Sequence, residues 1–280
     1  MSAKIAAVTM VRGGEFFLRK WTSWYGDMLG RDNLYIFFDG LDQVPPPCTE
    51  GCHVSVVPRV EGNVARADRG RIDILSECAA HLLESYDFVI GTDVDEFICT
   101  DPACGKSLPQ YLSSLGESDA VCWSPLGCDV VQRLGSERPL DRGRPILSQR
   151  SYALLSTRYT KASILCKPVG WGSGFHRVRK GNFHILKDVY LFHMGCADAP
   201  EMIARQADAD LAERGWGRHL GKRGRLFETV AKLPVHDWDT WVPRARRLQG
   251  IFRPPYAWNK PAMLGLRILV RIPARFSELF

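Results

Sequence analysis

Apolar and polar positions divide the N-terminal third of the chain into alternating strands and helices. Apolar side chains at helical spacing predict one helix that starts near Phe17 and a second over residues 65–83. This alternation predicts an α/β fold, with an open, mostly parallel, Rossmann-like sheet and flanking helices. Runs of apolar and β-branched residues, typical of buried strands, occupy residues 4–11, 34–38, 53–58 and 86–92.

The pattern is more irregular after Pro102. Residues 127–145 are rich in Gly, Pro, Arg and Asp and read as a loop. We expect one domain over residues 1–215 and a helical, basic C-terminal extension over residues 216–280 that packs on it. The expected elements are short helices at 107–115 and 198–214, strands at 120–124, 151–157, 160–166 and 189–194, a helix at 237–249 and a basic, amphipathic tail at 262–276.

Three carboxylates follow the fourth predicted strand, in the order Asp93, Asp95 and Glu96. Open α/β sheets bind their ligands at the carboxyl ends of their strands. Asp93 and Asp95 are two residues apart and can converge on one hard cation through oxygen ligands. A solvated acidic turn is the alternative reading of this short pattern.

His193 is the candidate for a third protein ligand, because it ends a predicted strand far downstream of the acid pair. Oxygen ligands with one imidazole suit Mn²⁺, whereas Mg²⁺ prefers oxygen alone. We therefore expect Mn²⁺, or Mg²⁺, held by Asp93, Asp95 and His193. A histidine in the core or in a loop remains the alternative.

A basic, glycine-rich segment lies between the acids and His193. It contains Lys161, Lys167, the turn Gly170–Gly174, His176 and Arg177. Cationic side chains beside exposed backbone N–H groups can hold a diphosphate. A surface loop with scattered basic residues is the alternative.

Composition is typical of a soluble globular protein, at 45% hydrophobic and 24% charged residues. No apolar run reaches the roughly 18 residues of a membrane span, and residues 1–12 read as a strand instead of a signal peptide. The nine cysteines form no Cys-x-x-Cys pair, which disfavours a zinc site and fits reduced thiols. These features predict a cytoplasmic protein.

The net charge of +6 is concentrated in the last quarter of the chain. Such a basic tail predicts a peripheral contact with the anionic inner face of a membrane, with a solvated helix face as the alternative. No motif that combines basic and aromatic residues indicates nucleic acid. The clustered residues are Arg214, Arg218, Lys222, Arg223, Arg225, Arg244, Arg246, Arg247, Arg267, Arg271 and Arg275.

Taken together, these motifs resemble the GT-A-fold glycosyltransferases of the family 2-like group, over roughly residues 4–210. Members of this subgroup have a strand that ends in Asp-Val-Asp-Glu-Phe, a later Lys-x-Ile-x-x-Pro segment and a strand-borne histidine. The corresponding pieces here are Glu15–Trp21, Leu34–Gly40, Asp93–Phe97, Lys161–Pro168, His176 and His193, with one extra residue before Ile164 and one after it in Lys161–Pro168.

The resemblance implies a nucleotide-sugar donor, expected to be a UDP-sugar. Asp95 and His193 would ligate the metal, and Asp93 would lie near both the ribose and the metal. The residues expected to border the base or the rest of the donor are Thr9, Val11, Arg12, Asp39, Arg66, Arg69, Lys161 and Lys167.

The expected catalytic residues are Asp129 and His176. An inverting transfer needs a carboxylate that takes the proton from the acceptor hydroxyl. Asp129 lies in the region that faces the acceptor in this family, and Glu96 is the alternative base.

The expected function is metal-dependent transfer of a sugar to a glycan or lipid-linked hydroxyl in surface polysaccharide assembly, with inversion implied by the resemblance. Two other functions stay open: a sugar nucleotidyltransferase, or a non-catalytic glycan- or lipid-binding protein on the same fold. A phosphatase of the haloacid dehalogenase type is disfavoured. Those enzymes carry the Asp-x-Asp on the first strand, whereas Asp93 and Asp95 follow the fourth predicted strand.

Overall fold

The structure is a computed structural model of the 280-residue chain. It describes residues 3–59, 62, 64–116, 118–181, 184–206, 217–254 and 259–280. The proposed domain boundary between residues 215 and 216, and the end of the helix expected to reach residue 214, lie outside the described residues. None of the described helices combines the length and the apolar character that a membrane span requires.

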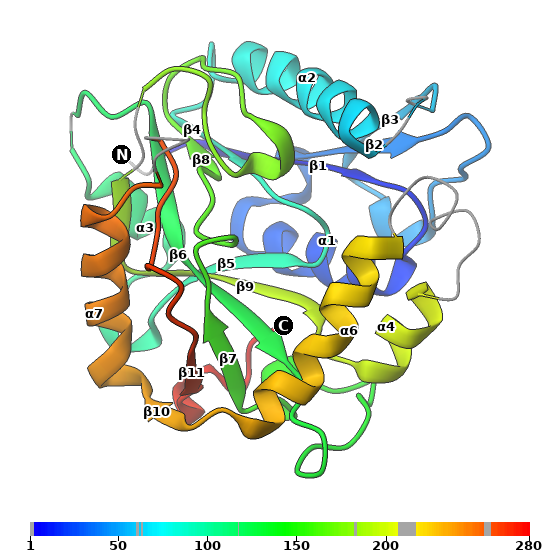
Figure 1. Cartoon of the computed structure of the whole chain (residues 1–280). Helices are drawn as coiled ribbons and strands as arrows, with labels where there is room; N and C mark the ends of the chain where they lie inside the picture. The colour runs from blue at the N-terminus through cyan, green and yellow to red at the C-terminus, as the bar shows by residue number, and fades with distance from the viewer. Residues whose placement is uncertain are drawn as a thin grey trace.

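The N-terminal half of the sheet is parallel and has helices on both faces, as the sequence predicts (Figure 1). Helix α1 (Glu15–Leu29) packs Leu18 and Trp21 on one face, and helix α2 (Val64–Leu82) packs Ile72 and Leu75 on the other. Because both faces are covered, β1 is buried at every residue. The four strands, in spatial order, are β4 (Phe88–Gly91), β1 (Ile5–Val11), β2 (Leu34–Asp39) and β3 (His53–Val57).

The other half of the sheet is mixed. Strand β8 (Ile164–Leu165) lies antiparallel between β4 and β6 (Cys122–Val131) and joins the two halves. The sheet continues through β7 (Tyr152–Leu155), β11 (Ile268–Arg271) and β10 (Val235–Asp237). Strand β9 (His184–Cys196) branches from β6 in parallel and pairs antiparallel with β5 (Glu96–Thr100).

The remaining helices pack around this mixed half. Helix α4 (Ala199–Gln206) contacts α6 (Gly217–Lys232), and α7 (Trp238–Ile251) contacts β9 and β11. Helix α3 (Leu108–Ser113) starts with a capping box between Ser107 and Gln110. The 3₁₀ turns are η1 (Arg31–Asn33), η2 (Pro47–Thr49), η3 (Pro102–Cys104), η4 (Ile146–Ser148), η5 (Ser173–Phe175) and η6 (Ala274–Phe276).

The C-terminal extension is helical over α6 and α7, as expected, but the basic tail expected over residues 262–276 contains a strand. Ile268–Arg271 forms strand β11, which pairs with β7 on one side and with β10 on the other. Arg275 bonds to Asp101 at 2.7 Å and to Asp239 at 2.6 Å. The tail is therefore part of the sheet.

The loop predicted over residues 127–145 begins later than expected, because β6 continues to Val131. Gly127 lies inside this strand. A Cβ there would come within 2.2 Å of the backbone carbonyl carbon of Tyr159. The glycine is required because the segment before β8 crosses β6 at backbone contact distance.

Candidate active site

Strand register places His193 between two carboxylates. On β9, His193 is the cross-strand partner of Glu96 on β5 and of Asp129 on β6. The turn between β4 and β5 carries Asp93 and Asp95, and the backbone N–H of Met194 donates to the Asp95 carbonyl at 2.8 Å. Residues from distant parts of the chain therefore meet beyond the carboxyl end of β4.

Asp95, Glu96 and His193 form a group that could hold a metal ion. One ligand atom from each lies within 4.8 Å of the others. His193 Nε2 lies 3.5 Å from Asp95 Oδ2, and the exposed fractions of Glu96 and His193 are only 1% and 6%. Three ligands, Asp93, Asp95 and His193, were expected from the sequence, and the structure groups Glu96, instead of Asp93, with Asp95 and His193.

The imidazole of His193 is held from two directions. Its Nδ1 lies 2.7 Å from Asp129 Oδ1, and the Tyr159 ring stacks on it at 3.8 Å between centroids. A proton on Nδ1 that bonds to the carboxylate leaves Nε2 as the lone-pair atom, on the side of Asp95. Metal-binding histidines are commonly oriented by such a carboxylate.

Gly195 leaves room beside the two ligand atoms. A Cβ at this position would come within 2.8 Å of His193 Nε2 and 3.0 Å of Asp95 Oδ2. Any side chain would fill the space that an ion shared by these atoms needs. Two carboxylates and one imidazole are a suitable donor set for Mn²⁺, so the residues fit the expected ion.

Asp93 is engaged by two cations. Its Oδ1 accepts from Arg71 at 2.6 Å, and its Oδ2 accepts from Lys161 at 2.9 Å. Burial would raise the pKa of this carboxyl, but Lys161 and Arg71 hold it well below its usual value. Arg71 also contacts Asp68 at 3.1 Å. Arg66 and Arg69 were expected near the donor, but the helix residue that contacts Asp93 is Arg71.

Lys161 links Asp93 to Glu96, which belongs to the candidate metal site. Its Nζ lies 2.9 Å from Asp93 and 2.5 Å from Glu96, and the residue is 2% exposed. Burial would lower the pKa of Lys161, but the two carboxylates raise it. Burial raises the pKa of Glu96 to about 7 against the opposing effect of Lys161. A buried cation between two carboxylates fixes the position of both.

The two residues expected to be catalytic lie in different surroundings. Asp129 is 5% exposed and hydrogen-bonded to His193, so it does not face an open acceptor region. His176 directly follows η5. Burial, and then Lys161 and Lys260, lower the pKa of His176 to about 3, which leaves a neutral imidazole at neutral pH.

The residues expected to border the base lie at the carboxyl ends of β1 and β2. Thr9 and Val11 are buried in β1, where Val11 is the register partner of Phe38. Arg12 donates to the Asp39 carbonyl at 2.8 Å and forms a bidentate pair with Asp42. Arg12 and Asp39 therefore lie together at the carboxyl ends of β1 and β2, and β1 is the neighbour of β4.

The structure does not bring Lys167 to this group. Leu165 is paired with Val89 in antiparallel register, so the chain after Leu165 runs toward the amino end of β4, away from Asp93. The Lys167 side chain is 45% exposed and lies 4.0 Å from Asp119. Arg66 and Arg69 are exposed on α2.

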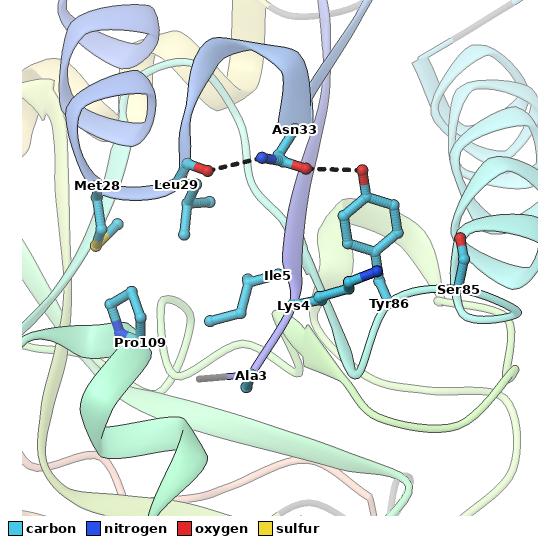
Figure 2. A pocket seen from close by; sticks show the side chains of 9 residues that line it. All are labelled: Ala3, Lys4, Ile5, Met28, Leu29, Asn33, Ser85, Tyr86 and Pro109. Carbon is cyan, nitrogen blue, oxygen red and sulfur yellow. Dashed lines mark hydrogen bonds between the residues drawn. The ribbon is translucent and has the colours of Figure 1, made fainter. Parts of the chain in front are cut away.

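A cavity of about 490 Å³ lies at the opposite end of the parallel strands (Figure 2). At its rim, the Tyr86 hydroxyl donates to Asn33, whose amide donates to the Leu29 carbonyl, both at 2.7 Å. The lining includes residues 3–5, which begin β1, whereas Asp95 follows the carboxyl end of β4. This cavity is therefore separate from the candidate metal site.

Comparisons with known proteins give distant structural likenesses. No family model matches the sequence, and no curated protein matches it. A mannosyltransferase from Pyrobaculum calidifontis, solved with GDP-Man and Mn²⁺, is 12% identical, with a TM-score of 0.39 over 88% of this chain and 74% of the other. A mannose-1-phosphate geranyltransferase from Thermus thermophilus is 12% identical, with a TM-score of 0.28 over 96% and 73%.

A third solved structure, a putative nucleotide-diphospho-sugar transferase from Desulfovibrio desulfuricans, is also 12% identical. Its TM-score is 0.25, over 45% of this chain and 59% of the other. At these values the likenesses do not establish a family, so the function has to be inferred from the residues of the site.

Proposed function

We propose that the chain is a metal-dependent glycosyltransferase of the GT-A type. It moves a sugar from a UDP-sugar to a hydroxyl of a glycan or lipid-linked acceptor in surface polysaccharide assembly. The observation that carries the proposal is the grouping of Asp95, Glu96 and His193 beside the space left by Gly195. The group lies beyond the carboxyl end of a parallel strand, where open α/β sheets bind ligands.

Asp95, Glu96 and His193 would hold the ion, which we take to be Mn²⁺ or Mg²⁺. When bound, it would offset negative charge on the diphosphate leaving group as a Lewis acid. Asp129 keeps His193 Nε2 directed toward Asp95. We assign Asp129 this positioning role in place of proton transfer, because its carboxylate is buried against His193.

The other residues would bind and orient the donor. Arg12 and Asp39, at the ends of β1 and β2, would contact the nucleobase. Asp93 would contact the ribose, and its carboxylate is held in position by Arg71 and Lys161. His176, as a neutral imidazole beside the Lys161 cation, would contact the substrate.

Calorimetric titration of UDP with and without Mn²⁺ tests the proposal. We expect UDP binding that depends on Mn²⁺ and becomes at least about tenfold weaker in Asp95→Asn, because a ligand is replaced by a neutral amide. Asp119→Asn is the matched control, since that side chain is fully exposed and lies outside the group. UDP affinity that does not depend on Mn²⁺, or that is the same in Asp95→Asn as in wild type, would reject the donor site. A parallel titration with GDP shows which nucleobase the site prefers.

We also propose a peripheral contact with anionic membranes. Ile251, Leu264 and Leu266 are 63%, 70% and 52% exposed. The Ala262 N–H donates to the Phe252 carbonyl at 3.0 Å, which brings the end of α7 beside the segment that carries the two leucines and Arg267. Exposed apolar side chains among arginines suit an anionic lipid surface.

Sedimentation with phosphatidylserine vesicles tests the membrane contact. The variant Leu264→Ser/Leu266→Ser should lose binding, whereas Leu134→Ser, at an exposed leucine elsewhere on the surface, should retain it. Equal binding by both variants would reject the contact.

A further inference from the structure

A second cavity, of about 310 Å³, lies between α2 and the hairpin Gly170–Arg179. Arginines from both elements enter its lining, Arg69 from α2 and two from the hairpin. The volume equals that of about ten water molecules, so the cavity has room for more than one phosphate group. The polar part of the lining consists of Arg69, Gly172, Ser173, Arg177, Arg179 and Asn259.

The hairpin is fixed in place. The Gly172 N–H donates to the Arg177 carbonyl at 2.7 Å, and the Arg179 N–H donates to the Gly170 carbonyl at 2.8 Å. Trp171 is fully buried, and its backbone N–H donates to the Ser76 hydroxyl of α2 at 3.0 Å. The arginines from the hairpin therefore project from a backbone that is attached to α2, and a ligand has only the exposed side chains to order.

Two glycines make room for the arginine side chains. A Cβ at Gly172 would come within 2.8 Å of Arg177 Cγ, and a Cβ at Gly170 within 3.2 Å of Arg179 Cδ. Gly172 has φ −91° and ψ 169°, which any residue adopts, so backbone conformation does not require glycine there. The absence of a side chain at Gly172 instead allows Arg177 to lie against the turn.

Positive charge in this cavity is only partly balanced. Among the described residues, Asp73 is the only carboxylate that forms an ion pair with Arg69, Arg177 or Arg179, and its partner is Arg179. Arg69 and Arg177, which form no ion pair among the described residues, can therefore bind an anion with several oxygens.

We infer that this cavity binds a phosphate or diphosphate group of the acceptor. The inference rests on the proposed sugar transfer. The same hairpin reaches the active site, because the Phe175 ring lies 5.5 Å from the Arg71 guanidinium and 5.6 Å from Lys161 Nζ. An acceptor anchored by its phosphate would thus lie beside the residues proposed to bind the donor, at a site separate from the metal ligands.

Titration of inorganic pyrophosphate into the full-length chain, with EDTA present to exclude metal, tests the site. Arg177→Gln should weaken binding about tenfold, since a charge-assisted bond to the anion is lost. Arg138→Gln, an exposed arginine outside the cavity, removes the same charge and should leave binding within twofold. If both variants lose the same pyrophosphate affinity, the binding is due to general electrostatic attraction, and the proposed site is wrong.

A charge-neutral pair of variants separates the cavity from general electrostatics. Gly172→Ala should weaken pyrophosphate binding several-fold, because the new methyl group displaces Arg177. Gly250→Ala, where a Cβ meets nothing within 4 Å, should have no effect. Unchanged binding in Gly172→Ala would contradict the site.

The same variants distinguish an acceptor group from the donor's own diphosphate. Arg177→Gln should leave the affinity for UDP with Mn²⁺ within twofold of wild type. A tenfold loss of UDP affinity would assign the cavity to the donor and overturn the acceptor site. If wild type fails to bind UDP with Mn²⁺ but binds pyrophosphate at Arg177, the proposed function fails while the anion site stands.

Discussion

At the scale of single residues, Lys161 links the two halves of the site. Its ammonium group lies between Asp93 and Glu96, and all three groups are fixed by this contact. A buried carboxylate that loses its cation is costly, because its charge is no longer compensated. The stability of the site therefore depends on this lysine as well as on any bound ion.

Lys161→Met should lower the free energy of unfolding by about 3–5 kcal/mol, the usual cost of breaking a buried ion pair. Lys167→Met, at a side chain that is 45% exposed, should change it by less than about 0.5 kcal/mol. Urea denaturation of both variants measures the difference. Similar small effects would mean that Lys161 does not stabilise the carboxylates.

His176 should contribute to the loss of stability in acid. Burial, and then Lys161 and Lys260, lower its pKa from 6.5 to about 3. Between these values the unfolded chain binds a proton at His176 that the folded chain does not, so stability falls as the pH drops below 6.5.

His176→Gln should therefore flatten the decrease in unfolding free energy between pH 6.5 and 4.5, by up to about 1.4 kcal/mol per pH unit. His81→Gln, at a side chain that is 81% exposed, is the control. Urea denaturation across this range supplies the slopes, and equal slopes in the two variants would contradict a buried, neutral His176.

The sequence predicts part of the residue-level site. Asp93, Asp95 and His193 were expected as ligands, and Asp95 and His193 lie with Glu96 in the group that could hold a metal ion. Glu96 could not be placed with them, because its position depends on the register between β5 and β9, which residue patterns do not show. Arg71 was missed for a similar reason: its contact with Asp93 depends on how α2 lies across the sheet.

At the scale of elements, apolar runs identify the first strands well, because buried parallel strands are continuously apolar. The later strands were less predictable. Strand β6 contains Pro125 and Gly127, residue types that normally end a strand. Gly127 is required because the backbone of Tyr159 and Thr160 crosses β6 at this position. Such a tertiary requirement leaves no periodic pattern in the sequence.

Gly91 at the end of β4 is a second close approach. A Cβ there would come within 2.7 Å of Trp171 and 2.8 Å of Phe175. Gly91→Ala should therefore lower the unfolding free energy by about 1–3 kcal/mol through overpacking. Gly250→Ala, on the exposed side of α7, should not destabilise the chain. An unchanged Tm of Gly91→Ala in thermal denaturation would contradict this packing of the hairpin on β4.

At the scale of the whole molecule, the C-terminal tail completes the sheet and the core. Phe276 is fully buried, and Phe280 packs 5.9 Å from Phe192 between ring centroids. The tail's basic composition suggested a surface segment, because the arginines are obvious in the sequence whereas the pairing partners of β11 are not.

Removal of residues 262–280 should therefore prevent cooperative folding, because the edge of β7 and the core around Phe192 become exposed. Neutralising the exposed arginines in Arg267→Gln/Arg271→Gln should preserve the fold. Circular dichroism during heating, with size-exclusion chromatography, checks both. A truncated chain that stays monomeric with an unchanged Tm would show that the tail is dispensable.

The central claim is that Asp95, Glu96 and His193 form a divalent metal site, and Mn²⁺ binding followed by electron paramagnetic resonance without nucleotide tests it most directly. His193→Gln should weaken Mn²⁺ binding at least about tenfold, and Gly195→Ala should do the same by filling the space beside Nε2. His184→Gln, at an exposed histidine on the same strand, should bind Mn²⁺ as wild type does. Equal Mn²⁺ affinity in wild type and His193→Gln would contradict the metal site.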